Sequence, residues 1–267
     1  MSKDVNELHP LWSVKKGDRA LFTTALHSGH DVRHEIEQLL LINENCRLRE
    51  EDPYTDQLAK ISQNYIIPLR SRFEVDLNRK RNEAVYLKPE DAWGLKVWKE
   101  QPSREMIQRT LQEYDQFYTK TKQLLKRLEK LYQHFVIFDL HSYNHRRDGP
   151  LSQPQEQLNN PDVNVGTGTM ERGRWDKVVD RFISDLKAYN FQGGHLDVRE
   201  NVKFSGRQFA TFVHTNFPNS GCVLSIEIKK IFMDEWTGIL DKERFNSIRN
   251  AIKSTLPGIF EELKRYG

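Results

Sequence analysis

The stretch VIFDLHS, residues 136–142, decides the fold. It contains four apolar residues, and such a run is typical of a strand that is buried within a sheet. The apolar run ends at His141. A second stretch, RALFTTALHSGH at residues 19–30, has the same form, because its apolar and Thr-rich run ends at His27. We therefore expect two buried strands that each present a histidine at the carboxyl end.

Amphipathic segments separate these strands from others. Apolar residues recur at three- and four-residue steps from Ser103 to Phe135, which predicts a long helix that Ser103 caps. Asp31 is expected to cap an earlier helix. Residues 144–170 are rich in Pro, Gly and Asn and predict a long surface loop beside the site. Further strands are predicted at residues 65–69, 73–77, 209–214 and 223–228, and further helices at residues 32–41, 54–61, 175–189 and from 241 onward.

This order of elements predicts an α/β fold. Strands that alternate with helices form a mixed, mostly parallel sheet with helices on both faces. We expect a single domain over residues 1–267, with a core at about 19–240 and closing helices at 241–267. In sheets of this kind, functional residues gather at the carboxyl ends of the strands.

The composition argues against several classes of protein. The 41 Lys and Arg residues against 38 Asp and Glu residues give a formal charge of +3, and they are spread along the chain, so we expect no nucleic-acid partner. Cys46 and Cys222 lack CxxC spacing, which favours a reducing cytoplasm over a disulfide framework or a thiolate zinc site. No apolar run approaches the about 18 residues of a membrane helix, so we expect no membrane partner. The oligomeric state is left open.

The two histidines are candidate metal ligands. A catalytic zinc ion takes about three nitrogen or carboxylate ligands and keeps one position open for water. A single histidine at a strand end is more often structural, but His27 and His141 at two strand ends favour a metal. The third ligand is less clear, because the H-x-x-E spacing is absent. His30 and Glu50 are candidates, and we choose Asp52 from the acidic run, although such a run can also serve to cap a helix.

A glutamate and a pair of polar residues complete the predicted site. Glu227 stands between two isoleucines, where a carboxylate is costly unless it is paired or used, and we predict that it is the general base. The alternative is that Glu227 faces solvent on a one-sided strand. Arg79, with Arg72 near it, is predicted to bind a substrate carboxylate, and Asn78 to donate a further hydrogen bond. A surface ion pair is the simpler interpretation of these arginines.

Several motifs, in this order, resemble the N-formylglutamate amidohydrolase family, which is similar in fold to the zinc carboxypeptidases. The resemblance covers about residues 22–235. Its segments are LHSGH (26–30), REEDPYTDQL (49–58), SRFEVDLNR (71–79), DLHSYN (139–144), DVNVGTG (162–168), NFQGGH (190–195) and LSIEIKKIFMDE (224–235). Two positions depart from the family pattern: Leu26 stands where proline commonly precedes the first histidine, and His30 stands where histidine is not expected.

The resemblance implies a role for each predicted residue. His27 and His141 match metal-binding histidines, and the family's acidic segment supports Asp52 as the third ligand. Glu227 matches the carboxylate that activates water and passes its proton to the leaving amine. The Asn78 and Arg79 pair matches the residues that bind a substrate carboxylate in the carboxypeptidase relatives. Gly193 and Gly194, within NFQGGH, are added as substrate-binding residues.

The resulting hypothesis is a hydrolase with one zinc ion per chain. It would cleave the amide bond of an N-formyl or N-acyl amino acid, a small substrate that carries a carboxylate. One alternative is a carboxypeptidase-like exopeptidase, which uses the same zinc, glutamate and arginine. A site closed by residues 144–170 would favour small N-acyl amino acids, whereas an open groove would admit peptides. A second alternative is a metal-binding or interaction module without catalysis.

Overall fold

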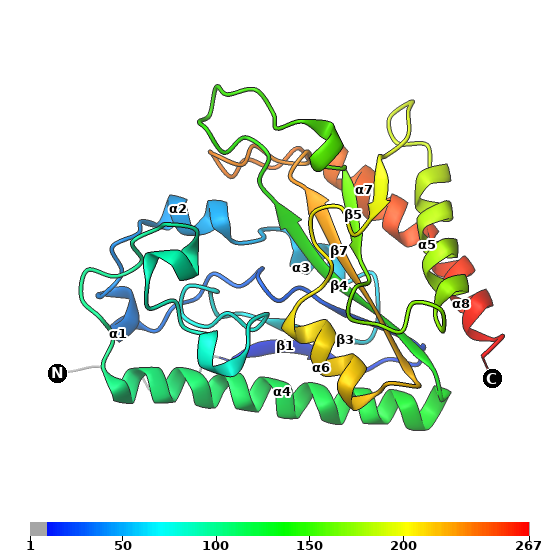
Figure 1. The fold of residues 1–267 in the computed structure, drawn as a ribbon, viewed down its shortest axis with the longest axis horizontal. Coiled ribbons are helices and arrows are strands. Elements are labelled where there is room, and N and C mark those ends of the chain that lie inside the picture. The colour runs from blue at the N-terminus through cyan, green and yellow to red at the C-terminus, as the bar shows by residue number, and fades with distance from the viewer. Residues whose placement is uncertain (1–9, 267) are drawn as a thin grey trace.

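A mixed β-sheet forms the centre of the molecule in the computed structural model, which describes residues 10–266 (Figure 1). Within these residues the sheet has seven strands in the order β1-β3-β2-β4-β7-β5-β6. The strands are β1 (Trp12–Lys15), β2 (Leu21–Thr24), β3 (Tyr65–Pro68), β4 (Phe135–Tyr143), β5 (Val163–Gly166), β6 (Val198–Glu200) and β7 (Gly221–Lys229). Strands β3, β2, β4 and β7 run parallel, and β5 is parallel to β6, whereas β1 and β5 pair antiparallel with β3 and β7. The predicted mixed, mostly parallel sheet is confirmed.

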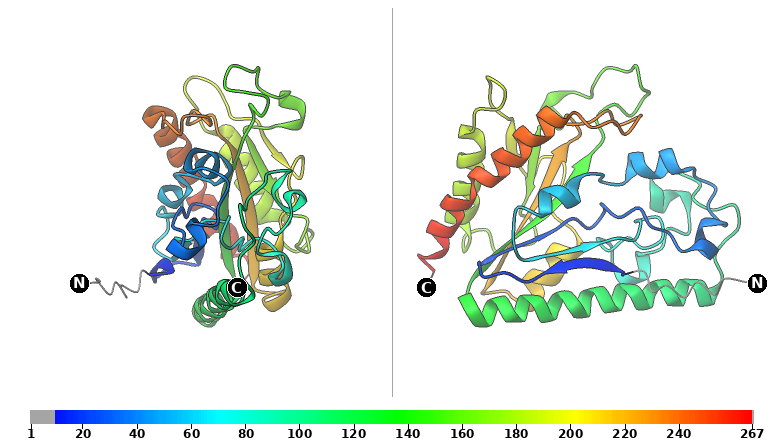
Figure 2. Two further views of the ribbon diagram at one scale, coloured as in Figure 1. Left: turned by 90° about the vertical axis from the view of Figure 1, so that its left-hand side faces the viewer. Right: turned by 180° about the vertical axis from the view of Figure 1, so that it is seen from behind.

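Helices cover both faces of this sheet, as the sequence predicts (Figure 2). They are α1 (His34–Glu37), α2 (Glu44–Glu50), α3 (Thr55–Ala59), α4 (Arg104–Tyr132), α5 (Asp176–Ala188), α6 (Gln208–Asn216), α7 (Lys242–Ser254) and α8 (Leu256–Leu263). One apolar core lies between the sheet and α3, α5, α7 and α8. A second core lies between the opposite face and α4 with α6. The sheet is therefore buried on both faces, which explains the continuous apolar runs of its central strands.

The two faces of β4 and β7 differ near the carboxyl ends. Even-numbered apolar residues of both strands pack into the first core along the whole strand: Val136, Phe138 and Leu140 in β4, and Cys222, Leu224, Ile226 and Ile228 in β7. The opposite face begins apolar and then becomes polar, because side chains alternate along a strand. Its polar residues are Asp139 and His141 in β4 and Ser225 and Glu227 in β7. The functional residues thus extend one face of the sheet beyond the second core.

Several predicted elements are confirmed at nearly the expected residues. Strand β3 matches the prediction at 65–69, β7 matches 223–228, and α5 matches 175–189. Helix α4 begins after Ser103, whose side-chain oxygen accepts a hydrogen bond from the Met106 backbone at 3.3 Å. The closing helices α7 and α8 lie within the predicted 241–267.

Two predicted strands are wrong. Residues 73–77 lie in turns and irregular backbone, since the Val75 backbone N–H donates to the Ser71 carbonyl at 3.1 Å and no strand within residues 10–266 pairs with them. Their alternating apolar side chains are nevertheless buried. Residues 209–214 form part of α6, because Phe209, Ala210 and Val213 stand three and four residues apart on one helical face that packs into the second core.

Other boundaries differ from the sequence prediction. The helix expected at 32–41 is reduced to α1, and Arg33, not Asp31, occupies its N-cap. Asp31 instead forms an isolated bridge with Arg70. The predicted loop at 144–170 includes β5, and the sequence did not indicate β1 or α2. Of the helices between residues 10 and 266, none is long and apolar enough to cross a membrane.

Candidate metal and catalytic site

Three neighbouring parallel strands bring the predicted residues together at one end of the sheet. His27 follows β2, His141 lies near the end of β4, and Glu227 lies near the end of β7. These strands are adjacent in the order β2-β4-β7. Their carboxyl ends therefore meet at one place, as expected for a site in an α/β sheet.

Asp52 reaches this place from the segment that follows α2. Its backbone N–H donates to the carbonyl of His27 at 2.9 Å. The buried Lys230 ammonium donates to the carbonyls of Arg49 and Glu51 at 2.6 and 2.8 Å. These hydrogen bonds hold the backbone that directly precedes Asp52. Backbone hydrogen bonds thus fix a carboxylate that is distant in sequence from both histidines.

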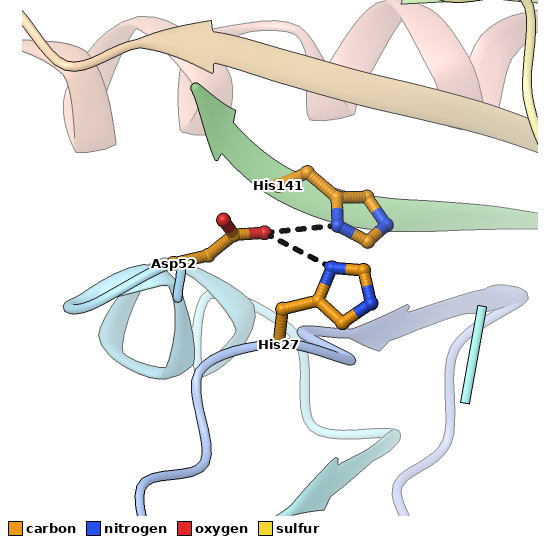
Figure 3. A group of neighbouring side chains, drawn as sticks. All are labelled: His27, Asp52 and His141. Atoms are coloured by element: carbon orange, nitrogen blue, oxygen red, sulfur yellow. Dashed lines mark hydrogen bonds and ion pairs between the residues drawn. The ribbon is translucent and has the colours of Figure 1, made fainter. Parts of the chain in front are cut away.

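The side chains of His27, Asp52 and His141 form a buried cluster (Figure 3). The Asp52 Oδ2 atom lies 3.4 Å from His27 Nδ1 and 3.0 Å from His141 Nδ1. The two imidazole rings have centroids 4.8 Å apart. In Figure 3 the second nitrogen of each ring points away from Asp52.

Those second nitrogens contact two further carboxylates. His27 Nε2 lies 2.7 Å from Asp76 Oδ1, and His141 Nε2 lies 3.0 Å from Asp139 Oδ1. A carboxylate accepts a hydrogen bond, so each contact favours a hydrogen on Nε2, which would leave the Nδ1 lone pair for a metal ion in place of the present Nδ1 contact with Asp52. Metal-binding histidines use this arrangement, in which an outer carboxylate orients the ring and raises its basicity.

The cluster has the dimensions of a metal site. Zinc binds nitrogen and oxygen ligands at about 2.0–2.1 Å, so tetrahedral ligands stand about 3.4 Å apart. The two measured separations from Asp52 match that spacing, and one ligand atom of each residue lies within 4.8 Å of the others. The three side chains could therefore hold a metal ion without rearrangement of the backbone.

The electrostatics of the cluster favour a cation. Burial by itself would raise the pKa of Asp52, but hydrogen bonds from His141 and His27 outweigh it and hold this pKa well below its usual range. Burial also opposes the charged form of His141, yet the carboxylates of Asp139 and Glu227 raise its pKa well above the usual value. Positive charge among these carboxylates is thus stabilised, and a divalent ion would supply it.

Glu227 lies beside the cluster with a perturbed acidity. Burial, together with the nearby carboxylates of Asp52 and Asp139, raises its pKa to about 7, although the charge of His141 acts in the opposite direction. Its side chain is only partly accessible and lines the same cavity as His27 and His141. Glu227 therefore faces an internal cavity on a sheet that is covered on both faces, in a state suited to proton transfer near neutral pH.

The cavity encloses about 590 Å³, including the open space at its mouth. Most of its lining residues are polar, and they carry both signs of charge. The lining residues are His27, Glu50, Asp52, Arg72, Asp76, Asn78, Trp93, His141, Ser142, Tyr143, Asn144, Arg147, Phe204, Arg207, Glu227 and Lys230.

The predicted carboxylate-binding residues do not all reach this cavity. Arg72 and Asn78 line it, but the Arg72 guanidinium donates to Asp76 at 3.0 Å and to the Tyr86 hydroxyl at 3.1 Å. Arg79 is not among the lining residues, and its Nη2 donates to the carbonyl of Asp91 at 2.6 Å. The guanidinium groups of both arginines therefore already form hydrogen bonds with other groups of the protein.

The remaining candidates are divided between the cavity and other places. Glu50 lines the cavity, where its Oε1 accepts a hydrogen bond from Asn144 at 3.2 Å. His30 contacts Glu51 and lines a different hollow, so it is not part of the His27 cluster. Gly193 and Gly194 are exposed in the loop between α5 and β6 and do not line the cavity.

Among the site residues that were not identified from the sequence are Asp76, Asp139, Arg207 and Lys230. A signal for Asp139 was available, because it stands two residues before His141 in a strand and alternation places both on one face. Asp76 had none, since residues 73–77 predict a strand, whereas Asp76 lies outside every strand and helix that the structure describes. Lys230 and Arg207 carried no local pattern either, because their positions depend on how distant segments pack.

Comparisons with known proteins identify a family and a fold. Residues 20–233 match the family model described as N-formylglutamate amidohydrolase. The solved structure of N-formylglutamate amidohydrolase from Ralstonia eutropha JMP134 is 16% identical, with a TM-score of 0.72 over 95% of this chain and 98% of that chain. A gene product of Agrobacterium tumefaciens is 14% identical, with a TM-score of 0.65 over 94% of this chain and 96% of that chain. These two likenesses show the fold. No curated protein matches the chain.

Proposed function

Because the chain belongs to the N-formylglutamate amidohydrolase family, we propose that it is a zinc-dependent hydrolase of the amide bond in N-formyl or other N-acyl amino acids. The observation that carries the proposal is the convergence of three ligand atoms, from His27, Asp52 and His141, beside the carboxylate of Glu227. Hydrolase and amidohydrolase activity follow from the family. The metal and the substrate are the proposed part.

The ligand set supports zinc. Two imidazole nitrogens and one carboxylate oxygen, with a fourth position open to a cavity, are typical of catalytic zinc sites. Magnesium and calcium prefer sites made of oxygen atoms. When bound, zinc polarises a substrate carbonyl and lowers the pKa of a water molecule to about 7.

Glu227 moves the proton in this proposal. Its carboxylate accepts a proton from the attacking water as the oxygen forms a bond to the acyl carbon. The same group then gives the proton to the amide nitrogen as the carbon–nitrogen bond breaks, which releases a carboxylic acid and an amine. A pKa of about 7 suits both steps, because a group that accepts and returns a proton works best when its pKa is near the working pH.

The cavity wall favours a small substrate. Tyr143, Asn144 and Arg147, at the end of β4 and the start of the following loop, form part of the wall. Trp93 and Phe204 add apolar surface from two other loops. Residues from several segments therefore surround the cluster, as expected for a site that encloses a single N-acyl amino acid.

The test combines metal analysis with a substrate panel. Purified protein is assayed for zinc and then for hydrolysis of N-formyl amino acids, N-acetyl amino acids and short peptides. We expect about one zinc ion per chain, faster hydrolysis of the N-acyl amino acids than of peptides, and loss of activity on chelation with recovery on addition of zinc.

Two outcomes would contradict the proposal in different ways. Hydrolysis of peptides alone, from their C-terminal end, would identify a carboxypeptidase-like exopeptidase. Protein without zinc, whose melting temperature does not rise when zinc is added, would identify a module without a functional metal site.

A further inference from the structure

The basic residues that line the cavity differ in how they are engaged. Lys230 donates to two backbone carbonyls, and Arg72 donates to Asp76 and Tyr86. Arg147 Nη1 lies 3.7 Å from a Glu50 carboxylate oxygen. Across residues 10–266, the guanidinium of Arg207 forms no hydrogen bond or ion pair with the protein. Arg207, an exposed residue, is therefore the cavity-lining cation that is free to pair with a bound ligand.

The loop that carries Arg207 is held in place. The side chain of Asn164, in β5, accepts a hydrogen bond from Lys203 N–H at 2.8 Å and donates to the Phe204 carbonyl at 2.7 Å. Gly206 has φ +95°, a conformation that favours glycine and turns the chain toward α6. This order gives Arg207 a defined backbone position beside the cavity, so a ligand that binds it need not order the loop.

Arg207 also lies close to the catalytic face. The first turn of α6 is attached to Asn78, because the Phe209 backbone N–H donates to Asn78 Oδ1 at 3.1 Å. A recess of about 400 Å³, with the open space at its mouth included, adjoins the main cavity, and both are lined by Asn78, Phe204, Arg207 and Glu227. A molecule whose amide lies at Glu227 can thus place another of its groups against Arg207.

Two buried polar atoms elsewhere in the wall indicate a polar ligand. Ser142 and Asn144 line the cavity, and neither Ser142 Oγ nor Asn144 Oδ1 has a hydrogen-bond partner within the part of the chain that the structure describes. Their residues are only 6% and 2% exposed. Buried polar groups are seldom left unpaired in folded proteins, so these atoms are expected to pair with ordered water or with a bound polar molecule.

We propose that Arg207, and not Arg79, binds the carboxylate of the substrate. The inference rests on the proposed amide hydrolysis and names the residue that selects an acidic substrate. An arginine can donate two parallel N–H hydrogen bonds to one carboxylate. An N-acyl amino acid carries such a carboxylate. Arg79 lacks this freedom, since its Nη2 donates to a carbonyl and its guanidinium lies over the ring of Tyr86.

The carboxylate can come from two parts of an N-acylated acidic amino acid, its α-carboxylate or its side chain. The kinetic test therefore uses three substrates: N-formylglutamate, N-formylglutamine and the α-amide of N-formylglutamate. Each is assayed with the wild type, Arg207→Ala, Arg79→Ala and Arg104→Ala. Arg104 is an exposed arginine outside the cavity and provides the matched loss of one positive charge.

We expect Arg207→Ala to raise KM for N-formylglutamate by about 10- to 100-fold, the range for a charged hydrogen bond, while kcat changes little. Of N-formylglutamine and the α-amide of N-formylglutamate, the one that lacks the carboxylate bound by Arg207 should bind the wild type weakly. Its KM should not change in Arg207→Ala, and this result identifies which carboxylate Arg207 binds. Arg104→Ala should match the wild type. An Arg207→Ala enzyme with unchanged KM for all three substrates would overturn the inference, and so would a KM increase confined to Arg79→Ala.

A binding measurement separates this inference from the proposed activity. Calorimetry with free glutamate, a molecule without an amide bond to cleave, compares zinc-loaded wild type with Arg207→Ala. Weaker binding by the variant supports the role of Arg207 even if the wild type hydrolyses no amide. Equal binding by the two proteins contradicts that role even if the wild type is an active amidohydrolase.

Discussion

His141 and Glu227 are register partners on the parallel strands β4 and β7. Partners in neighbouring parallel strands project to the same face of a sheet, so the imidazole and the carboxylate share one cavity. The neighbouring pair, Asp139 and Ser225, lies two residues earlier on the same face. A metal-ligand candidate, its orienting carboxylate and a candidate base are therefore positioned by one strand pairing.

Replacement of Glu227 by Gln should strongly slow catalysis and preserve the metal site. The amide has nearly the same shape but cannot accept a proton, and loss of a general base typically costs about 10²–10⁴-fold in rate. We expect kcat to fall within that range while the zinc content stays at one ion per chain. The exposed Glu171→Gln is the control, and wild-type turnover by Glu227→Gln would refute the assignment.

Asp139→Asn should weaken metal binding without removal of a ligand. The carboxylate of Asp139 orients His141 through Nε2, and loss of such an outer partner typically weakens metal affinity about 10- to 100-fold. Competition with a chelator of known zinc affinity measures the change. Asp18→Asn, an exposed substitution, should leave the affinity unaltered, and an unaltered affinity in Asp139→Asn would show that Asp139 does not support the site.

The stability of the metal-free protein should depend on pH through Glu227. Its folded pKa of about 7 lies above the ordinary 4.5, so the folded state retains a proton that the unfolded chain has released between these values. The contribution of Glu227 to the free energy of unfolding is therefore largest below about pH 4.5 and declines as pH rises toward 7. The decline is roughly 2 kcal/mol for a carboxylate that is partly accessible in the cavity.

Urea unfolding of the wild type and Glu227→Gln, with chelator present, tests this dependence. The variant cannot ionise, so it should be the more stable protein at pH 8, and the two free energies of unfolding should converge near pH 4.5. Parallel stability curves across this range would show that the environment of Glu227 does not disfavour its charge.

Lys230→Met should loosen the segment that carries Asp52. Burial lowers the pKa of Lys230 to about 8, and its ammonium donates to the carbonyls of Arg49 and Glu51. Removal of both donors leaves two carbonyls without these partners, which should cost about 2 kcal/mol of unfolding free energy.

Zinc affinity should fall together with stability in Lys230→Met, because Asp52 would lose its fixed position. The exposed Lys126→Met, on α4, is the control for the change of charge. A Lys230→Met protein that is less stable but binds zinc as tightly as the wild type would limit Lys230 to a purely structural role.

The sequence predicted those parts of the fold that repeat a strong local pattern. The apolar runs before His27 and His141 can be recognised because strands buried on both faces need apolar residues at nearly every position. Helix α4 can be recognised from its long periodic stripe and from Ser103. Short segments were less clear. The brief apolar run at Phe209 fits a strand and a buried helix equally well, so the pattern alone cannot distinguish the predicted strand from the observed helix α6.

Only part of the site could be predicted from the sequence, because local patterns do not show which distant segments meet in the fold. Alternation along a strand relates Asp139 to His141, but it says nothing about Asp52, whose place depends on a backbone hydrogen bond to His27. The prediction for Arg79 followed a motif, and tertiary contacts hold its guanidinium against Asp91 and Tyr86. Arg207 could be found only after folding had placed its loop at the cavity.

The most direct test of the central claim is a zinc titration of activity. Protein freed of metal by chelation is supplied with increasing zinc, and hydrolysis of an N-formyl amino acid is followed at each step. We expect activity to rise in proportion to added zinc and to level off at one ion per chain. Full activity in the metal-free protein, or a metal-loaded protein that cleaves no amide, would contradict the proposal.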